Sequence, residues 1–218
     1  MKTETQAALV PGQVYYPWVG QHFSTSNPRI LFLGHSHYGD EEHDPDPHLT
    51  NSVIAGHLER GGLPFFTKLA QLGTGLPAHE IDLQNFFERI AFMNLLQGTL
   101  EGPRMAAPSE SLARDVAILA MLLKRLKPTH IVMLGNDVWS ALNNSGHLLL
   151  DLQDEPYRSG SIEKIPAFLC RHPSGGFSSE KWARQLGAFL RDHGVKRDSL
   201  EQWVAATRRE SPASWLLG

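Results

Sequence analysis

The chain has a single cysteine, Cys170, among its 218 residues. One cysteine excludes an internal disulfide, and it excludes a zinc or iron–sulfur site built from four cysteines. Because the preceding residues, Phe168 and Leu169, are apolar, we expect Cys170 to be a buried strand residue. The thiol is therefore given a structural role and no catalytic one.

Long apolar runs are also missing. No window is apolar and long enough to span a bilayer, and the N-terminal sequence MKTETQAALVPGQ lacks the basic-then-apolar order of a secretory signal. Hydrophobic residues make up 41% of the chain, which is ordinary for a globular domain. We therefore expect a soluble, cytoplasmic protein that has no contact with a membrane.

Neither sign of charge is in large excess, since the formal net charge is -3. This small value argues against a large, non-specific nucleic-acid footprint. The charge is unevenly spread, however. Residues 1–156 carry 10 Lys+Arg and 17 Asp+Glu, a balance of -7, whereas residues 157–218 carry 10 and 6, a balance of +4. If the protein contacts phosphates, the C-terminal third should make those contacts.

Alternating strand-like and helix-like segments indicate the fold class. Apolar runs at residues 29–33, 90–93, 130–134 and 167–170 are separated by amphipathic helical patterns. This alternation predicts an α/β fold, namely a three-layer α/β/α sandwich with a central four-stranded parallel sheet. Residues 1–28, rich in proline and glycine, are expected to form an arm packed on a single domain of residues 29–218.

Two polar motifs directly follow two of these runs. The sequence GHSHYGD, residues 34–40, follows the first run, and RHPSGGFS, residues 171–178, follows the fourth. The carboxyl ends of parallel strands meet at one edge of a sheet, where open α/β folds bind their ligands. We therefore expect the functional site at this edge.

The first motif by itself permits two other interpretations. It approaches the G-x-S-x-G nucleophile elbow, but Tyr38 occupies the place of the second glycine, which disfavours an esterase. His35, His37 and Asp40 approach the H-x-H-x-D spacing of dinuclear metallohydrolases, with the aspartate one residue late. A metallohydrolase that uses these three residues stays open as an alternative function.

Five segments, taken in order, resemble the uracil-DNA glycosylase superfamily. Residues 29–39 resemble its first motif, and HPSGGFS at residues 172–178 resembles its second motif, His-Pro-Ser-Pro-Leu-Ser. Between them, G-x-P-F at residues 62–65, the strand ending at Asn94 and the strand–Gly–helix segment 130–142 are similar to segments of the same superfamily. An ordered match of this kind is more specific than any one short pattern.

The resemblance implies the sandwich described above, an active cleft at the strand ends, and cleavage of the N-glycosidic bond of a nucleotide flipped out of DNA. It implies that His172 donates a hydrogen bond to the departing base. The best-known branch of the family has its water-activating aspartate where Ser36 stands here, so we assign that acid to Asp40, with Glu41 and Glu42 as alternatives. The other residues implied are base-binding Tyr38, Phe65 and Asn94, and DNA-backbone-binding Ser36, Ser174, Gly175 and Gly176.

The bulky first motif predicts altered specificity. We therefore expect a monomeric DNA-base glycosylase that acts on a uracil-like or modified pyrimidine in single- or double-stranded DNA, in repair or in defence against phage. It should need no cofactor. The alternative from another class is a non-catalytic nucleic-acid or nucleotide-binding module that retains this fold.

Overall fold

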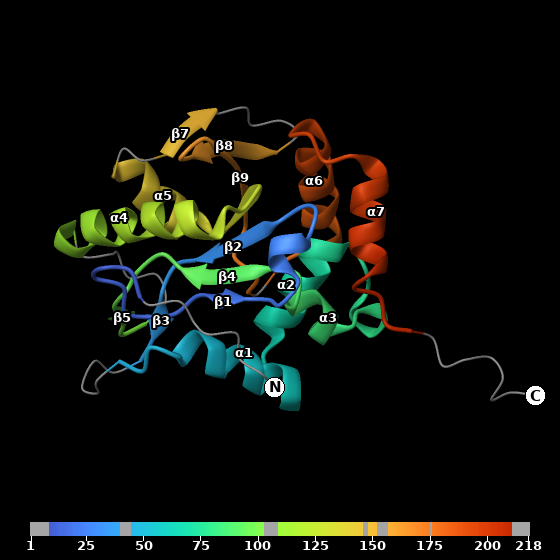
Figure 1. Ribbon diagram of the computed structural model, residues 1–218, viewed down its shortest axis with the longest axis horizontal. Helices are drawn as coiled ribbons and strands as arrows, with labels where there is room; N and C mark the ends of the chain where they lie inside the picture. The colour runs from blue at the N-terminus through green and yellow to red at the C-terminus, as the bar shows by residue number, and fades with distance from the viewer. Residues whose placement is uncertain are drawn as a thin grey trace, which may run out of the picture.

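The computed structural model describes residues 9–39, 45–102, 109–145, 148–151, 157–174 and 176–210 (Figure 1). Its centre is a seven-stranded sheet in the order β1-β4-β2-β6-β9-β8-β7. Four neighbouring strands are parallel: β4 (Ala91–Asn94), β2 (Ile30–Gly34), β6 (His130–Leu134) and β9 (Ile165–Cys170). These are the four strands predicted from the apolar runs, and the predicted α/β class is confirmed.

The prediction of a purely parallel, four-stranded sheet was wrong. Strand β1 (Trp18–Val19) pairs antiparallel with β4, and the hairpin of β7 (Leu148–Asp151) and β8 (Arg158–Ile162) adds antiparallel to β9. Strand β1 has only two residues, and β8 has the sequence RSGSI, so neither carries the alternating apolar pattern that identifies a strand. The added strands make the sheet mixed at both edges.

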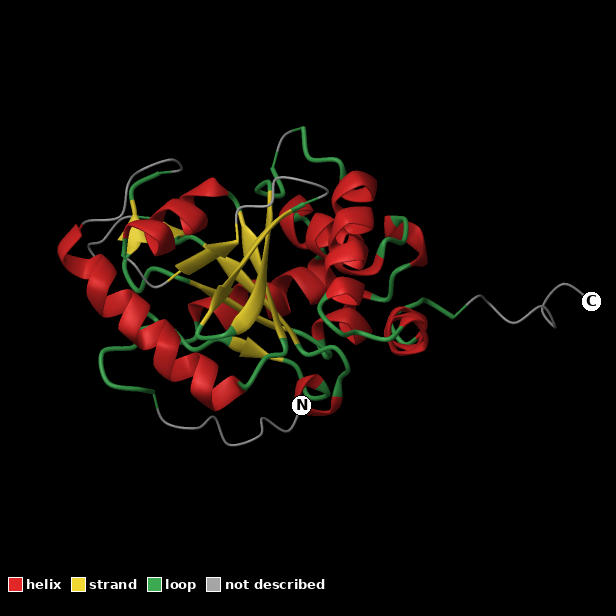
Figure 2. Ribbon diagram, turned by 90° about the horizontal axis from the view of Figure 1, so that it is seen from above, coloured by secondary structure: helices red, strands yellow, loops and turns green. Residues whose placement is uncertain are grey.

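Helices cover both faces of the sheet, as Figure 2 shows from above. On one face lie α4 (Ser109–Leu126) and α5 (Asn136–Asn144). The other face carries α2 (Pro64–Thr74), α3 (Leu83–Phe87), α6 (Ser179–Asp192) and α7 (Arg197–Ala205). The remaining helices are α1 (Leu49–Arg60) and the short 3₁₀ turns η1 (Phe23–Thr25) and η2 (Ala78–Glu80).

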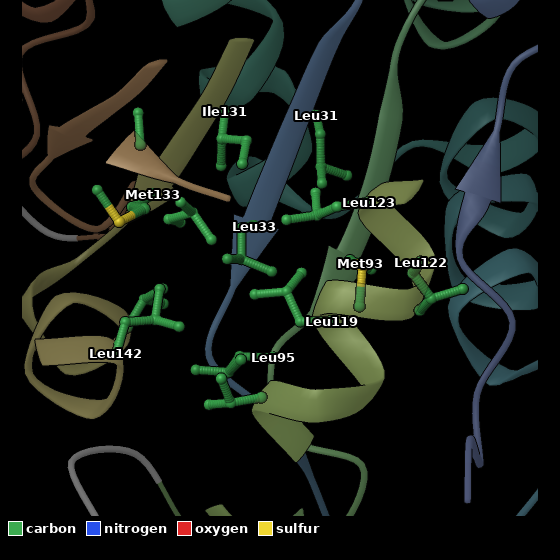
Figure 3. Close-up of a cluster of buried hydrophobic side chains, with 14 of the residues drawn as sticks. Leu31, Leu33, Met93, Leu95, Leu119, Leu122, Leu123, Ile131, Met133 and Leu142 are labelled. Carbon is green, nitrogen blue, oxygen red and sulfur yellow. The ribbon is translucent and has the colours of Figure 1, made fainter. Parts of the chain in front are cut away.

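The strand residues divide between two cores because successive side chains point to opposite faces. Leu31 and Leu33 pack with Leu119 and Leu142 beneath α4 and α5 (Figure 3). Their neighbour Phe32 joins the second core, under α2, α3 and α6. Each face therefore has its own apolar layer, and the sheet lies between them.

The N-terminal residues pack on this body. Tyr15 is buried, and the Trp18 indole Nε1–H donates a 2.8 Å hydrogen bond to the Phe87 carbonyl oxygen. A separate pair of short parallel strands, β3 (His37–Tyr38) and β5 (Thr99–Leu100), carries part of the first motif. Cys170 is fully buried, as predicted, and burial raises the pKa of its thiol. Across the described ranges, none of the helices has the length and apolarity needed to cross a bilayer.

Candidate functional site at the carboxyl edge of the sheet

The four parallel strands deliver polar groups to one edge. His35 follows β2, Asn94 ends β4, Gly135 follows β6, and His172 lies two residues beyond β9. The strands are hydrogen-bonded neighbours, with Gly34 paired to Asn94 and Leu134 paired to Cys170. Residues far apart in the sequence are therefore brought to the same end of the sheet, as expected.

Asn94 is held beside a glycine that makes room for its side chain. A Cβ atom on Gly34 would overlap the Oδ1 atom of Asn94. Asn94 is half-buried, and its amide makes no hydrogen bond with any described residue. The Asn94 oxygen thus packs against the Gly34 backbone, where only glycine leaves room for it.

An aromatic ring faces the second motif. Phe65 lies in the first turn of α2, directly after Pro64 at the start of the helix. Its ring centroid is 5.3 Å from that of His172, with the two planes tilted by 31°, and it is 6.0 Å from Phe92 in an edge contact. A Cβ atom on Gly34, which would overlap Asn94, would also lie 3.4 Å from the Cζ atom of the Phe92 ring. Phe65 thus contacts His172 on one side and, on the other, Phe92 of the strand that ends at Asn94.

The imidazole of His172 lies against the turn that follows β6. Gly135 has a φ of 106°, and a Cβ atom there would be 3.2 Å from the Cβ of His172. Burial lowers the pKa of His172, and the nearby carboxylate of Asp137 partly offsets this effect. His172 is therefore neutral at neutral pH and carries one N–H group that can donate a hydrogen bond.

Asp137 is a residue of this site that the sequence analysis missed. It is exposed and is the second residue of α5. Its charge also raises the pKa of His35, against the larger lowering caused by burial. The Nδ1 atom of His35 is buried and has no hydrogen-bond partner. The sequence feature that could have drawn attention to Asp137 is its position two residues after Gly135, the glycine that follows β6.

Tyr38 lies at the rim, with 47% of its surface exposed. Partial burial raises the pKa of its hydroxyl, and the charge of Asp137 raises it further. The phenol is therefore protonated at neutral pH.

Two other residues of the first motif are engaged in internal contacts. The Ser36 side chain is buried, with its Oγ 2.7 Å from the His37 carbonyl oxygen and 3.1 Å from that of Gly98. The hydroxyl hydrogen of Ser36 is therefore directed to the backbone, so Ser36 is not among the residues that we propose to contact phosphate. The His37 Nε2 lies 3.0 Å from Thr50 Oγ1 in α1, and burial lowers the pKa of this imidazole to about 4.

These contacts bear on the metal alternative. In the portion of the chain that the structure describes, no three His, Cys, Asp or Glu side chains are grouped so that they could hold a metal ion. The His37 ring makes a hydrogen bond with Thr50, whereas His35 interacts electrostatically with Asp137 and His172. Asp40, Glu41 and Glu42, which were assigned as the candidate acids, lie outside the described residues.

Two cations flank the turn of the second motif. The amide of Ser174 donates to the His172 carbonyl oxygen over 2.7 Å, and the Ser174 carbonyl accepts a 2.9 Å hydrogen bond from Lys68 Nζ. Arg171 is exposed, and its guanidinium lies 3.8 Å from the position that a Cβ on Gly176 would take. Ser174 and Gly176 are exposed, and Gly175 lies outside the described residues. The turn therefore presents positive charge next to His172.

No protein-family model matches this chain, and no curated protein is significantly similar to it in sequence. The relation to the uracil-DNA glycosylase superfamily thus stays a prediction that depends on the motifs and on the geometry of the site.

Proposed function

We propose that the protein is a DNA-base glycosylase of altered specificity, which hydrolyses the N-glycosidic bond of a uracil-like or modified pyrimidine flipped out of DNA. One observation carries this proposal. The rings of Phe65 and His172 are in contact at the carboxyl edge of the sheet, and the amide of Asn94 ends a strand at the same edge. A planar base needs these three kinds of contact.

Each group has a distinct task in the proposed reaction. The flipped base stacks on Phe65, and the Asn94 amide hydrogen-bonds to its polar edge. When the bond between C1′ and the base nitrogen breaks, the electron pair passes to the base. The N–H of neutral His172 then donates a hydrogen bond to the base oxygen on which negative charge develops. A water oxygen forms the new bond to C1′.

The surroundings of the second motif suit the DNA backbone. Lys68 and Arg171 place positive charge at the turn, and small residues there permit close approach of a phosphate. The balance of +4 in residues 157–218 agrees with this assignment. We infer that a monomer binds one DNA strand through Lys68, Arg171, Ser174 and Gly176.

A base-release assay tests this function. Single- and double-stranded oligonucleotides carrying uracil, hypoxanthine, hydroxymethyluracil or glucosylated hydroxymethylcytosine are incubated with the protein, and abasic sites are revealed by alkaline cleavage. We expect abasic product from at least one modified pyrimidine. Binding of these oligonucleotides without product from any of them would overturn the proposal and would favour the non-catalytic binding module.

Substitution of Gly135 by alanine should impair this activity by displacing His172. The φ of 106° and ψ of 158° belong to a region that is essentially restricted to glycine, so a residue with a Cβ costs about 1–3 kcal/mol of stability there, and the new methyl group would lie against the His172 side chain. We expect release to slow by about 10- to 100-fold in Gly135→Ala, because a displacement near 1 Å has effects of this size. Single-turnover rates at saturating protein measure the change.

The matched control is Gly194→Ala. Gly194 has a φ of 93°, and no atom lies within 4 Å of the position of its Cβ. This variant should lose a similar amount of stability while it retains the wild-type rate. Equal rates in both variants would contradict the role given to the contact between Gly135 and His172.

A further inference from the structure

A cavity of about 400 Å³ lies between α2, α6 and α7. It is at the end of α2 opposite to Phe65, and its lining has no residue in common with the proposed base site. Its volume is within the range of small-molecule sites, about 300–1,000 Å³. The helices leave this space because the residues that face it from α2 and α6 include four with little or no side chain: Gly73, Gly75, Ala183 and Gly187.

The walls of this cavity are mainly aliphatic. Buried side chains of α6 and half-buried side chains of α7 form its floor: Leu186, Leu190, Leu200 and Val204. None of the described lining residues is aromatic. The hydroxyl of Thr74 is already used, because it donates a 2.8 Å hydrogen bond to the Ala70 carbonyl oxygen and accepts one of 3.2 Å from the Leu76 amide. The walls therefore favour an aliphatic ligand over a flat or polar one.

An unpaired cation lies at one end of the cavity. Arg191 is exposed, and a Cβ atom on Gly187 would be 3.5 Å from its Nη1 atom, so the guanidinium lies over α6 at that glycine. It makes no hydrogen bond or ion pair with any described residue. The second arginine of the lining, Arg184, is 3.9 Å from the Glu180 carboxylate. Arg191 follows Ala183 by eight residues, which is about 12 Å along the helix.

We propose that this cavity binds a fatty-acid-like ligand, namely an aliphatic chain with a carboxylate head. The chain packs on the floor formed by α6 and α7, and the carboxylate pairs with the Arg191 guanidinium, whose fork of donors matches its two oxygens. The opposite end is unfavourable for an anion, because the C-terminal end of α2 at Gly75 carries partial negative charge and Glu180 also lines the cavity. This inference is independent of the proposed glycosylase function.

Titration calorimetry with three probes tests the two parts of this ligand. Octanoate has both the chain and the charge, 1-octanol has the same chain without the charge, and acetate has the charge without the chain. We expect one octanoate to bind per protein chain, with 1-octanol bound about 10-fold more weakly because a charged hydrogen bond is lost. Acetate should not bind in the same concentration range. Equal affinity for octanoate and 1-octanol, or no binding of octanoate, would overturn the proposal.

Two variants locate the site. Gly187→Leu should fill the cavity and abolish octanoate binding, and it should fold, because leucine has a higher helix propensity than glycine and the new Cβ meets only ordinary contacts. Arg191→Gln needs no change in packing and should weaken octanoate binding by about 10-fold.

The matched control for the charge is Lys124→Gln. Lys124 is an exposed cation in the last turn of α4, as Arg191 is in the last turn of α6, but α4 lies on the other face of the sheet. This variant should bind octanoate as the wild type does. Wild-type affinity in Arg191→Gln, or in a Gly187→Leu protein that circular dichroism shows to be folded, would contradict the assignment of the ligand to this cavity.

Discussion

Replacing His172 by alanine is expected to slow base release by about 100-fold or more, the usual cost of removing one donor to a developing anion. Burial lowers the pKa of this imidazole, and the neutral ring keeps one N–H group that can donate a hydrogen bond. The substitution leaves the proposed DNA-binding residues Lys68 and Arg171 in place. The chemical step should therefore slow while DNA affinity changes little.

Single-turnover kinetics and DNA-binding titrations measure these two effects separately. His79→Ala is the control, because His79 is exposed in η2. Phe65 lies at the start of α2, whereas η2 follows the end of that helix. It should release base at the wild-type rate. A His172→Ala protein that also retains that rate would show that the departing base is stabilised by another group.

Replacing Phe86 by alanine is expected to lower the free energy of unfolding by about 3–5 kcal/mol. Phe86 is completely buried, and its ring lies 6.0 Å from Phe32 in β2 and 6.0 Å from Trp203 in α7. It also packs closely on Gly73 in α2, where an added Cβ would be 2.7 Å from the ring. The Phe86 ring thus packs between α2, α7 and the sheet. Its removal would leave a cavity that these helices and β2 cannot easily fill.

Urea unfolding measures the loss, and Phe65→Ala is the matched control. Phe65 is half-buried at the proposed base site, so its removal should cost less stability and should abolish stacking on the base. Phe86→Ala should therefore lower stability more, and Phe65→Ala should lower activity more. An unfolding midpoint for Phe86→Ala equal to that of the wild type would contradict the packing argument.

The central part of the fold could be read from the sequence because the pattern there is strong. The runs at residues 130–134 and 167–170 lie in β6 and β9, and the segments between the predicted strands contain helices such as α4 (Ser109–Leu126).

The candidate site was predictable only in position. The carboxyl edge follows from parallel strands, and the structure places the rings of Phe65 and His172 in contact there. The phosphate contact predicted for Ser36 is not compatible with the structure, because its hydroxyl is directed to the backbone.

The sequence by itself determined the α/β class, the four parallel strands and the edge at which polar motifs gather, because apolar periodicity reports which face of each element is buried. Tertiary structure alone decided the antiparallel additions at both ends of the sheet, since short or polar strands gain their stability from pairing with a neighbour. It also decided which polar side chains remain free. The hydroxyl of Ser36 and the ring of His37 lie in hydrogen bonds within the protein, which no sequence pattern indicated.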